Sequence, residues 1–177
     1  MGEYSEALSL HQKALEIRDK ILPANHQDLA QSFNNIGAVY YQTQQYPRAL
    51  SYYEKVLDIF LKPLPANHPS LATGYNNVGG AHDIMGEYSN ARSFYETVLE
   101  IDKKSLPSNH PDLAASYNNL ALVHENMNEF IQALSYYERA PEIFQRNLSA
   151  NHPDLTSIYN NIAKLYDKMR EHATVVT

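Results

Sequence analysis

The sequence contains no cysteine among its 177 residues. Without thiols it can form neither a disulfide scaffold nor a thiolate zinc site, and it offers no cysteine nucleophile. It also lacks an excess of positive charge, because 14 Lys and Arg residues stand against 20 Asp and Glu residues, a net charge of -6. A general binder of phosphate backbones needs a basic face, so this balance argues against nucleic acid as a partner.

Long hydrophobic runs are missing as well. No apolar stretch approaches the roughly 20 residues that a helix needs to cross a bilayer, and the N-terminus lacks a signal-peptide pattern. The hydrophobic fraction of 44% is nevertheless typical of a chain that folds. Together these features predict a mildly acidic cytoplasmic protein with no membrane partner.

What the sequence does contain is a fourfold repeat without insertions. Asn-His pairs and Asn-Asn pairs each recur every 42 residues. The Asn-His pairs begin at Asn25, Asn67, Asn109 and Asn151, and the Asn-Asn pairs begin at Asn34, Asn76, Asn118 and Asn160. The repeats fill nearly the whole chain, so we predict a single array over residues 1–170 and a disordered tail over residues 171–177.

Each repeat has the pattern of two helices. Tyr75, Gly79 and His82 lie at i, i+4 and i+7, which places them on one helical face, and Pro69 suits the first turn of that helix. Pro141 falls inside an expected helix and predicts a local bend or break there. Because a two-helix unit cannot bury its apolar face alone, the units are expected to stack. The expected helices span residues 3–18, 27–42, 46–61, 69–84, 88–104, 111–126, 130–146 and 153–168.

The spacing of Phe33, Gly37 and Tyr40, followed by Ala49 and Tyr53, resembles the tetratricopeptide repeat (TPR). The usual repeat has about 34 residues. The longer form found here, with its Asn-His-Pro-Asp-Leu-Ala segment, is similar to the repeats of kinesin light chains. This resemblance implies an all-α TPR-type α-solenoid, a right-handed superhelix of antiparallel helix pairs, with about four repeats and an incomplete repeat at each end.

The resemblance also implies a binding surface, because the first helices of TPR arrays line a concave groove. Paired asparagines dominate the groove side of these helices, and a side-chain amide can hold a peptide backbone because it both donates and accepts hydrogen bonds. A second, compatible interpretation is that one Asn of each pair bonds to a neighbouring helix. The candidate groove residues are Asn34, Asn35, Tyr41, Asn76, Asn77, Asp83, Asn118, Asn119, Leu122, Glu125, Asn160, Asn161 and Lys164.

The charges of this groove limit the classes of peptide that it is expected to bind. Chaperone-binding members of the family grip a C-terminal carboxylate with Lys and Arg, whereas Asn34, Asn77 and Asn119 stand at such positions here. Kinesin light chain grooves prefer acidic peptides with an aromatic anchor, but this groove carries the acidic residues Asp83 and Glu125. We therefore expect a neutral or weakly basic extended peptide segment.

No pattern indicates catalysis, a metal site or a cofactor. The histidines of the Asn-His pairs lie one repeat apart, so they cannot converge on one ion. His82 and His124 replace tyrosines at a packed position and are expected in the core as hydrogen-bonded residues. Gly79 and Gly80 fall inside an expected helix and not in a phosphate-binding loop.

The sequence therefore predicts non-catalytic binding of a protein or peptide segment by a kinesin-light-chain-like adaptor or scaffold. Two alternatives stay open. One is a structural spacer whose uncovered end helices join head to tail with those of another copy. The other is an accessory repeat array of a longer enzyme or signalling protein. The uncovered ends also fit a fragment whose neighbouring repeats are missing.

Overall fold

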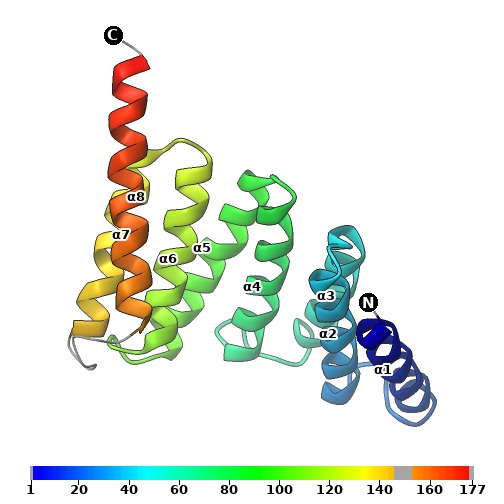
Figure 1. Cartoon of the computed structure of the whole chain (residues 1–177). Helices are drawn as coiled ribbons and strands as arrows, with labels where there is room; N and C mark the ends of the chain where they lie inside the picture. The colour runs from blue at the N-terminus through cyan, green and yellow to red at the C-terminus, as the bar shows by residue number, and fades with distance from the viewer. Residues whose placement is uncertain (1, 146–152, 176–177) are drawn as a thin grey trace. The chain divides into compact units, whose positions relative to one another are not determined.

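The computed structural model describes residues 2–145 and 153–175 (Figure 1). These residues form eight α-helices and no strand, in agreement with the predicted fold class. The helices are α1 (Gly2–Ile21), α2 (Gln27–Gln42), α3 (Tyr46–Phe60), α4 (Pro69–Ile84), α5 (Tyr88–Ser105), α6 (Pro111–Asn126), α7 (Phe130–Gln145) and α8 (Pro153–Val175). The two helices of a repeat pack on one another in the pairs α2 with α3 and α6 with α7.

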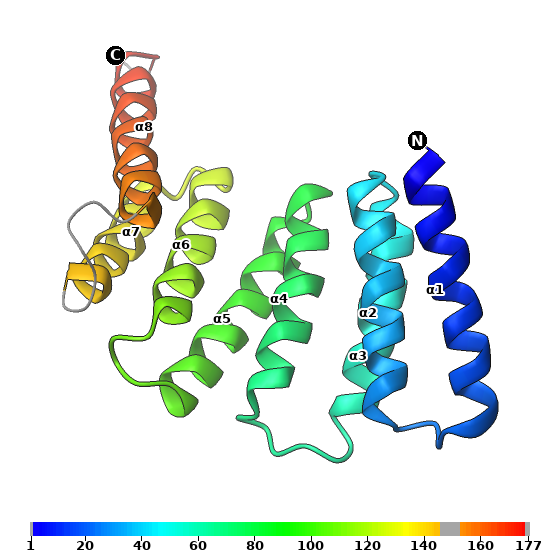
Figure 2. The same cartoon turned by 60° about the horizontal axis from the view of Figure 1, so that its bottom comes forward.

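The chain divides into two compact units, Met1–Ile101 and Asp102–Thr177, with the boundary inside α5. In the first unit, α2 packs against both α1 and α3, and α3 packs against α4 (Figure 2). In the second unit, α7 packs against α6 and α8. The single array expected over residues 1–170 stays a prediction.

Three helices begin at the same histidine cap. His26, His68 and His110 have extended backbones, and the Nδ1 atom of each accepts a hydrogen bond of 3.1–3.2 Å from the backbone N–H two residues later. This bond satisfies one of the N–H groups that the start of a helix leaves unpaired. These histidines cap helices, a role that their spacing in the sequence did not predict. The fourth Asn-His pair lies outside the described residues.

A residue with a left-handed backbone stands two positions after the last residue of α2, α4 and α6. Gln44, Gly86 and Asn128 have φ angles of 60°, 79° and 61°. Arg170 stands at the equivalent position of the last repeat, and there α8 continues to Val175. The disordered tail expected from residue 171 is therefore wrong as far as residue 175. The extension also makes a tertiary contact, since the ring of His172 meets that of Phe130 at 5.6 Å.

Small residues allow the paired helices to approach closely. A Cβ atom built on Gly37 would lie 2.7 Å from the Tyr53 ring, so this glycine makes room for the aromatic side chain of the partner helix. Ala49 and Ala133, at one repeat position of the second helices, are both fully buried. Tyr137 is fully buried beside Ala133 in the core of the second unit. The small residues therefore give close helix-to-helix contacts, and aliphatic side chains together with tyrosine rings fill the core around them.

His82 and His124 are buried and hydrogen-bonded, as predicted. The Nδ1 atom of His82 lies 2.6 Å from a carboxylate oxygen of Glu87, and that of His124 lies 2.6 Å from Glu129. In both pairs the glutamate directly precedes the next helix, α5 or α7. These bonds fix the end of one helix to the start of its partner.

Pro141 does not break α7, which continues through it to Gln145. The expected break is therefore wrong, while the bend stays a prediction. A proline removes one backbone N–H from the helix. The flanking side chains of Tyr137, Ala140 and Ile143 are buried, and their packing holds the helix on both sides of the proline.

Candidate functional site

Hydrogen bonds between asparagine side chains link successive repeats. In the first unit, Nδ2 of Asn77 donates to Oδ1 of Asn34 at 2.8 Å. In the second unit, Nδ2 of Asn161 donates to Oδ1 of Asn118 at 3.2 Å. The donor is the second Asn of one pair and the acceptor is the first Asn of the preceding pair. The interpretation that an Asn bonds to a neighbouring helix is confirmed for these four residues.

The linked amides keep hydrogen-bonding capacity beyond this contact. A primary amide has two donor hydrogens and an oxygen with two lone pairs. The bond from Asn77 to Asn34 uses one hydrogen of the first and one lone pair of the second. Both side chains are half-buried, so they remain partly accessible. In each linked pair, the accepting residue therefore keeps both hydrogens of its NH₂ group, and the donating residue keeps both lone pairs of its oxygen.

A hollow lies beside each linked pair, at equivalent repeat positions. The hollow of the first unit has a volume of about 190 Å³ and that of the second about 300 Å³. Asn34 lines the former, and its equivalent Asn118 lines the latter together with Asn161. The other lining residues are Gln27, Ala30, Gln31, Val56, Phe60, Ser70, Thr73 and Gly74 in the first unit, and Pro111, Asp112, Ala114, Ala115, Ser157 and Ile158 in the second.

The remaining candidate asparagines differ from one another. Asn35 accepts a hydrogen bond of 3.0 Å from the side chain of Gln31, one turn earlier in the same helix. Asn160 is exposed. Asn76 and Asn119 are half-buried, and each has an interaction partner. The asparagines of a pair therefore do not divide simply into a structural residue and a free one.

In the first unit the structure brings Tyr41 and Asp83 together. Partial burial raises the pKa of the Tyr41 phenol, and the neighbouring Tyr46 and Asp83 raise it further. The Tyr41 ring meets the Tyr46 ring edge-on at 5.4 Å. Burial and the Asp83 charge also raise the pKa of Tyr95. Asp83 thus places negative charge beside two tyrosines, Tyr41 and Tyr95.

Glu125 differs from the open groove carboxylate that the sequence predicted. Its side chain is buried, with 8% of the residue exposed. It accepts hydrogen bonds from the Tyr137 hydroxyl at 2.9 Å and from Nζ of Lys168 at 2.5 Å. Both contacts stabilise the charge, so Glu125 joins α6, α7 and α8 and is not available to a ligand as a free anion.

The last two candidates have contrasting surroundings. Leu122 is partly buried and packs on the core cluster of the second unit. Lys164 is exposed on α8. Within the described ranges, no group of three or more His, Cys, Asp or Glu residues could hold a metal ion. Nor is any described helix long and apolar enough to span a bilayer.

Comparison with known proteins identifies the repeats. A family model described as tetratricopeptide repeat matches residues 1–62 and 112–175, and a second model of the same description matches residues 71–112. The chain therefore belongs to the tetratricopeptide repeat family. Its repeats form a protein-interaction module of the TPR α-solenoid type. No curated protein matches the chain.

Several solved structures share this fold. A putative kinesin light chain from Podosopora anserina, with nearly identical TPR-like repeats, is 26% identical with a TM-score of 0.83, covering 98% of this chain and 83% of that one. BtubC from P. vanneervenii is 23% identical with a TM-score of 0.83, covering 94% and 66%. The apo form of RapI is 21% identical with a TM-score of 0.82, covering 98% and 61%. The resemblance to kinesin light chain repeats is confirmed.

Proposed function

We propose that this chain is a non-catalytic adaptor or scaffold that binds an extended peptide segment at the hollows beside its linked asparagines. The observation that carries the proposal is the recurrence of one arrangement in both units. In each, an amide pair that joins two repeats lies beside a hollow. If the asparagine pairs only stabilised the packing of successive repeats, they would need the amide hydrogen bond but no hollow beside it.

The amide pair suits a peptide backbone. An extended peptide presents N–H and C=O groups along its edges, and each of these groups needs a partner when it leaves water. The remaining N–H donors of Asn34 can bond a peptide carbonyl, and the oxygen of Asn77 can accept from a peptide N–H. These backbone contacts do not depend on the side chains of the peptide. The hollow then selects for peptide side chains that fit about 190–300 Å³ of space.

The charges that line the hollows favour a neutral or weakly basic segment. Asp112 lines the hollow of the second unit, and none of the described residues that line the hollow of the first unit is charged. A strongly acidic peptide would therefore meet repulsion in the second unit, and the described lining of neither hollow supplies a cation to compensate it.

Peptide titration tests this proposal. Twelve-residue peptides selected from a random library on the whole chain are titrated by fluorescence anisotropy, together with acidic and basic variants of each. The double variant Asn34→Ala/Asn77→Ala removes both amides and is expected to weaken binding about tenfold, the effect of one or two hydrogen bonds. Asn35→Ala is the control, because its amide bonds to Gln31 on its own helix.

Two outcomes would reject the proposal. One is tighter binding of the acidic peptides than of their basic counterparts, with an affinity that the Asn34→Ala/Asn77→Ala variant lowers. The other is an equal loss of affinity in the Asn35→Ala control. Thermal unfolding of each variant, followed by circular dichroism, shows that lost binding does not reflect lost folding.

Self-assembly is a second candidate, favoured by the exposure of the first and last helices. No residue of α1 is buried. Its Ile17 is 63% exposed, whereas Ile59, at the same repeat position of α3, is 7% exposed. Tyr166 of α8 is 53% exposed, whereas its equivalent Tyr40 in α2 is 8% exposed. A second copy could cover these faces in the way that α2 and α3 cover each other, which would give rings or filaments.

Sedimentation equilibrium distinguishes this candidate from peptide binding. Head-to-tail assembly predicts a mass that rises with protein concentration, and Tyr166→Glu is expected to return the chain to a monomer. Peptide binding by the Tyr166→Glu variant should stay unchanged. A single monomeric mass over the whole concentration range rejects assembly and leaves the first proposal standing.

A further inference from the structure

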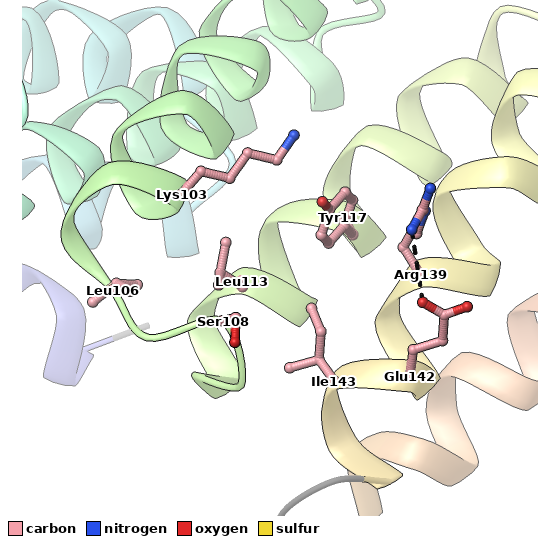
Figure 3. Close-up of a pocket in the computed structure, with 8 residues that line it drawn as sticks. All are labelled: Lys103, Leu106, Ser108, Leu113, Tyr117, Arg139, Glu142 and Ile143. Atoms are coloured by element: carbon pink, nitrogen blue, oxygen red, sulfur yellow. Dashed lines mark ion pairs between the residues drawn. The ribbon is translucent and has the colours of Figure 1, made fainter.

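A third pocket lies in the second unit and shares no lining residue with the hollow beside Asn118 (Figure 3). Its volume is about 270 Å³. The end of α5, the loop that follows, α6 and α7 all contribute to it. The lining residues are Lys103, Leu106, Ser108, Leu113, Tyr117, Arg139, Glu142 and Ile143. We call this site the basic pocket.

The floor of the basic pocket is apolar and its rim is charged. Leu113 and Ile143 are buried, with 4% and 8% exposure. At the rim, Nζ of Lys103 lies 5.4 Å from the centre of the Tyr117 ring. Figure 3 shows Lys103 and Arg139 on two sides of Tyr117, with the Arg139 guanidinium above Glu142. The pocket therefore offers an apolar cavity between two cations.

The cation of Arg139 is held only weakly. Its Nη1 atom lies 3.8 Å from a carboxylate oxygen of Glu142, and the two side chains are 65% and 59% exposed. Exposed ion pairs of this kind contribute little to stability. An incoming carboxylate could therefore replace Glu142 as the partner of Arg139 at small cost.

The first unit has the same apolar floor at the equivalent repeat positions. Leu29 and Ile59 stand there in place of Leu113 and Ile143, and both are buried in one core cluster. An aromatic residue, Phe33, likewise stands in place of Tyr117. The floor is thus a general feature of the repeat.

The charges at the rim are not a general feature of the repeat. Asp19 in the first unit stands in place of Lys103, which reverses the charge. Lys55 there stands in place of Arg139, and its Nζ lies over the rings of Phe33 and Tyr52 at 5.3 and 4.9 Å. The middle repeat has no cation at either position, because Leu61 and Thr97 stand there. Of these three repeats, the one in the second unit alone combines two cations with this floor.

We propose that the basic pocket binds an acidic peptide segment that presents one aliphatic side chain. The aliphatic side chain packs on Leu113 and Ile143 and leaves water. The carboxylates next to it lie between Lys103 and Arg139, which can both donate charge-assisted hydrogen bonds. The charge preference is thus opposite to that of the hollows beside the asparagines. One chain would therefore bind two segments of opposite charge at separate sites.

Three matched peptides test the proposal on the full chain. The acidic probe is acetyl-Glu-Asp-Leu-Glu-Asp-amide, a neutral probe replaces the acids with Gln and Asn, and a third probe replaces Leu with Ala. Binding is followed by two-dimensional NMR of isoleucine and leucine methyl groups. The acidic leucine probe is expected to shift the methyl signals of Ile143 and Leu113, and each of the other probes should bind more weakly.

Charge variants distinguish binding at the basic pocket from nonspecific attraction of the acidic probe to lysine and arginine side chains elsewhere. Arg139→Gln is expected to lower the affinity for the acidic probe about two- to fivefold, as for the loss of one exposed ion pair. Lys103→Asp, which gives the charge found in the first unit, should weaken it more. Glu142→Gln frees Arg139 and should tighten binding. Lys55→Gln, at the equivalent position of the first unit, is the control and should leave affinity unchanged.

The proposal is overturned if the neutral probe binds as tightly as the acidic one, or if Lys55→Gln weakens binding as much as Arg139→Gln. Weaker binding after Glu142→Gln would also overturn it, because the carboxylate would then be part of the binding site. None of these results bears on peptide binding at the hollows beside the asparagines. The two proposals can therefore be rejected independently of each other.

Discussion

Asn77 donates a 2.8 Å hydrogen bond to Asn34, which stands 43 residues earlier. The separation exceeds the 42-residue repeat by one, so the bond joins the second asparagine of one repeat to the first asparagine of the preceding repeat. Asn161 and Asn118 repeat this relationship in the second unit. Asparagine is a poor residue inside helices, and this contact gives it a physical reason to recur there.

A double-mutant cycle on this pair measures its energy. Asn77→Ala is expected to lower the free energy of unfolding by about 0.5–1.5 kcal/mol, and Asn34→Ala by a similar amount. The double variant should lose less free energy of unfolding than the two single variants added together. Each single variant leaves the remaining amide without its partner, whereas the double variant removes both amides. Urea unfolding of the four proteins gives the coupling energy. Strict additivity would show that the two amides do not interact.

The histidine caps should stabilise the first helices. His68→Ala removes the acceptor for the backbone N–H of Ser70 and is expected to cost about 1 kcal/mol. His68→Ser keeps a capping oxygen and is the matched control, expected to unfold close to the parent chain. Urea midpoints of the three proteins make the comparison. Equal destabilisation by both substitutions would contradict a capping role.

Gly37 and Gly80 should respond oppositely to alanine. At Gly37 the added Cβ would lie 2.7 Å from the Tyr53 ring, so Gly37→Ala is expected to cost about 1–3 kcal/mol through overpacking. At Gly80 the nearest atom is the Tyr95 hydroxyl at 3.6 Å, an ordinary contact. There the better helix propensity of alanine should add about 0.5–1 kcal/mol. Thermal unfolding of both variants tests the contrast, and a stabilising Gly37→Ala would refute the packing described here.

Asp102 should make stability depend on pH. It is buried, with 5% exposure, and accepts a 2.5 Å hydrogen bond from the Ser116 hydroxyl. Burial raises the pKa of Asp102, while the Ser116 bond opposes the rise. Because the pKa in the folded state lies above that in the unfolded state, the folded protein holds the proton more tightly. The resulting stability is fully present below the unfolded pKa and is lost as pH rises through the folded pKa.

Asp102→Asn removes this titration and keeps an oxygen that can accept from Ser116. The variant should therefore gain stability relative to the parent chain as pH rises from 3 to 7. Urea unfolding at several pH values measures the difference. A difference that stays constant over this range, or that grows in favour of the parent chain, would contradict a raised pKa.

The repeat period determined most of what the sequence could predict about the fold. Apolar spacing and Pro69 located the helices closely, because each of these signals lies within one short segment. The last turns of α8 were missed, since Arg170 replaces the turn-forming residue found at Gly86 and Asn128. That substitution was readable in the sequence. The contact of His172 with Phe130 that accompanies it was not.

The candidate site was predicted only in outline. The positions of the asparagines followed from helical geometry, but their bonding partners depend on the stagger between repeats, which the period alone does not give. Glu125 illustrates the same limit. Its position suggested an exposed carboxylate, whereas the Tyr137 hydroxyl and Lys168 enclose it from two other helices. The basic pocket was missed because Lys103 and Arg139 lie on different helices and 36 residues apart.

NMR of the side-chain amide groups, during titration with a peptide selected on the whole chain, tests whether a peptide backbone bonds the linked asparagines. The NH₂ signals of Asn34 and Asn77 are expected to shift together with saturation of binding, while that of Asn35 stays in place. A peptide that saturates the protein and leaves the Asn34 and Asn77 signals unmoved would show that it does not bind at these amides.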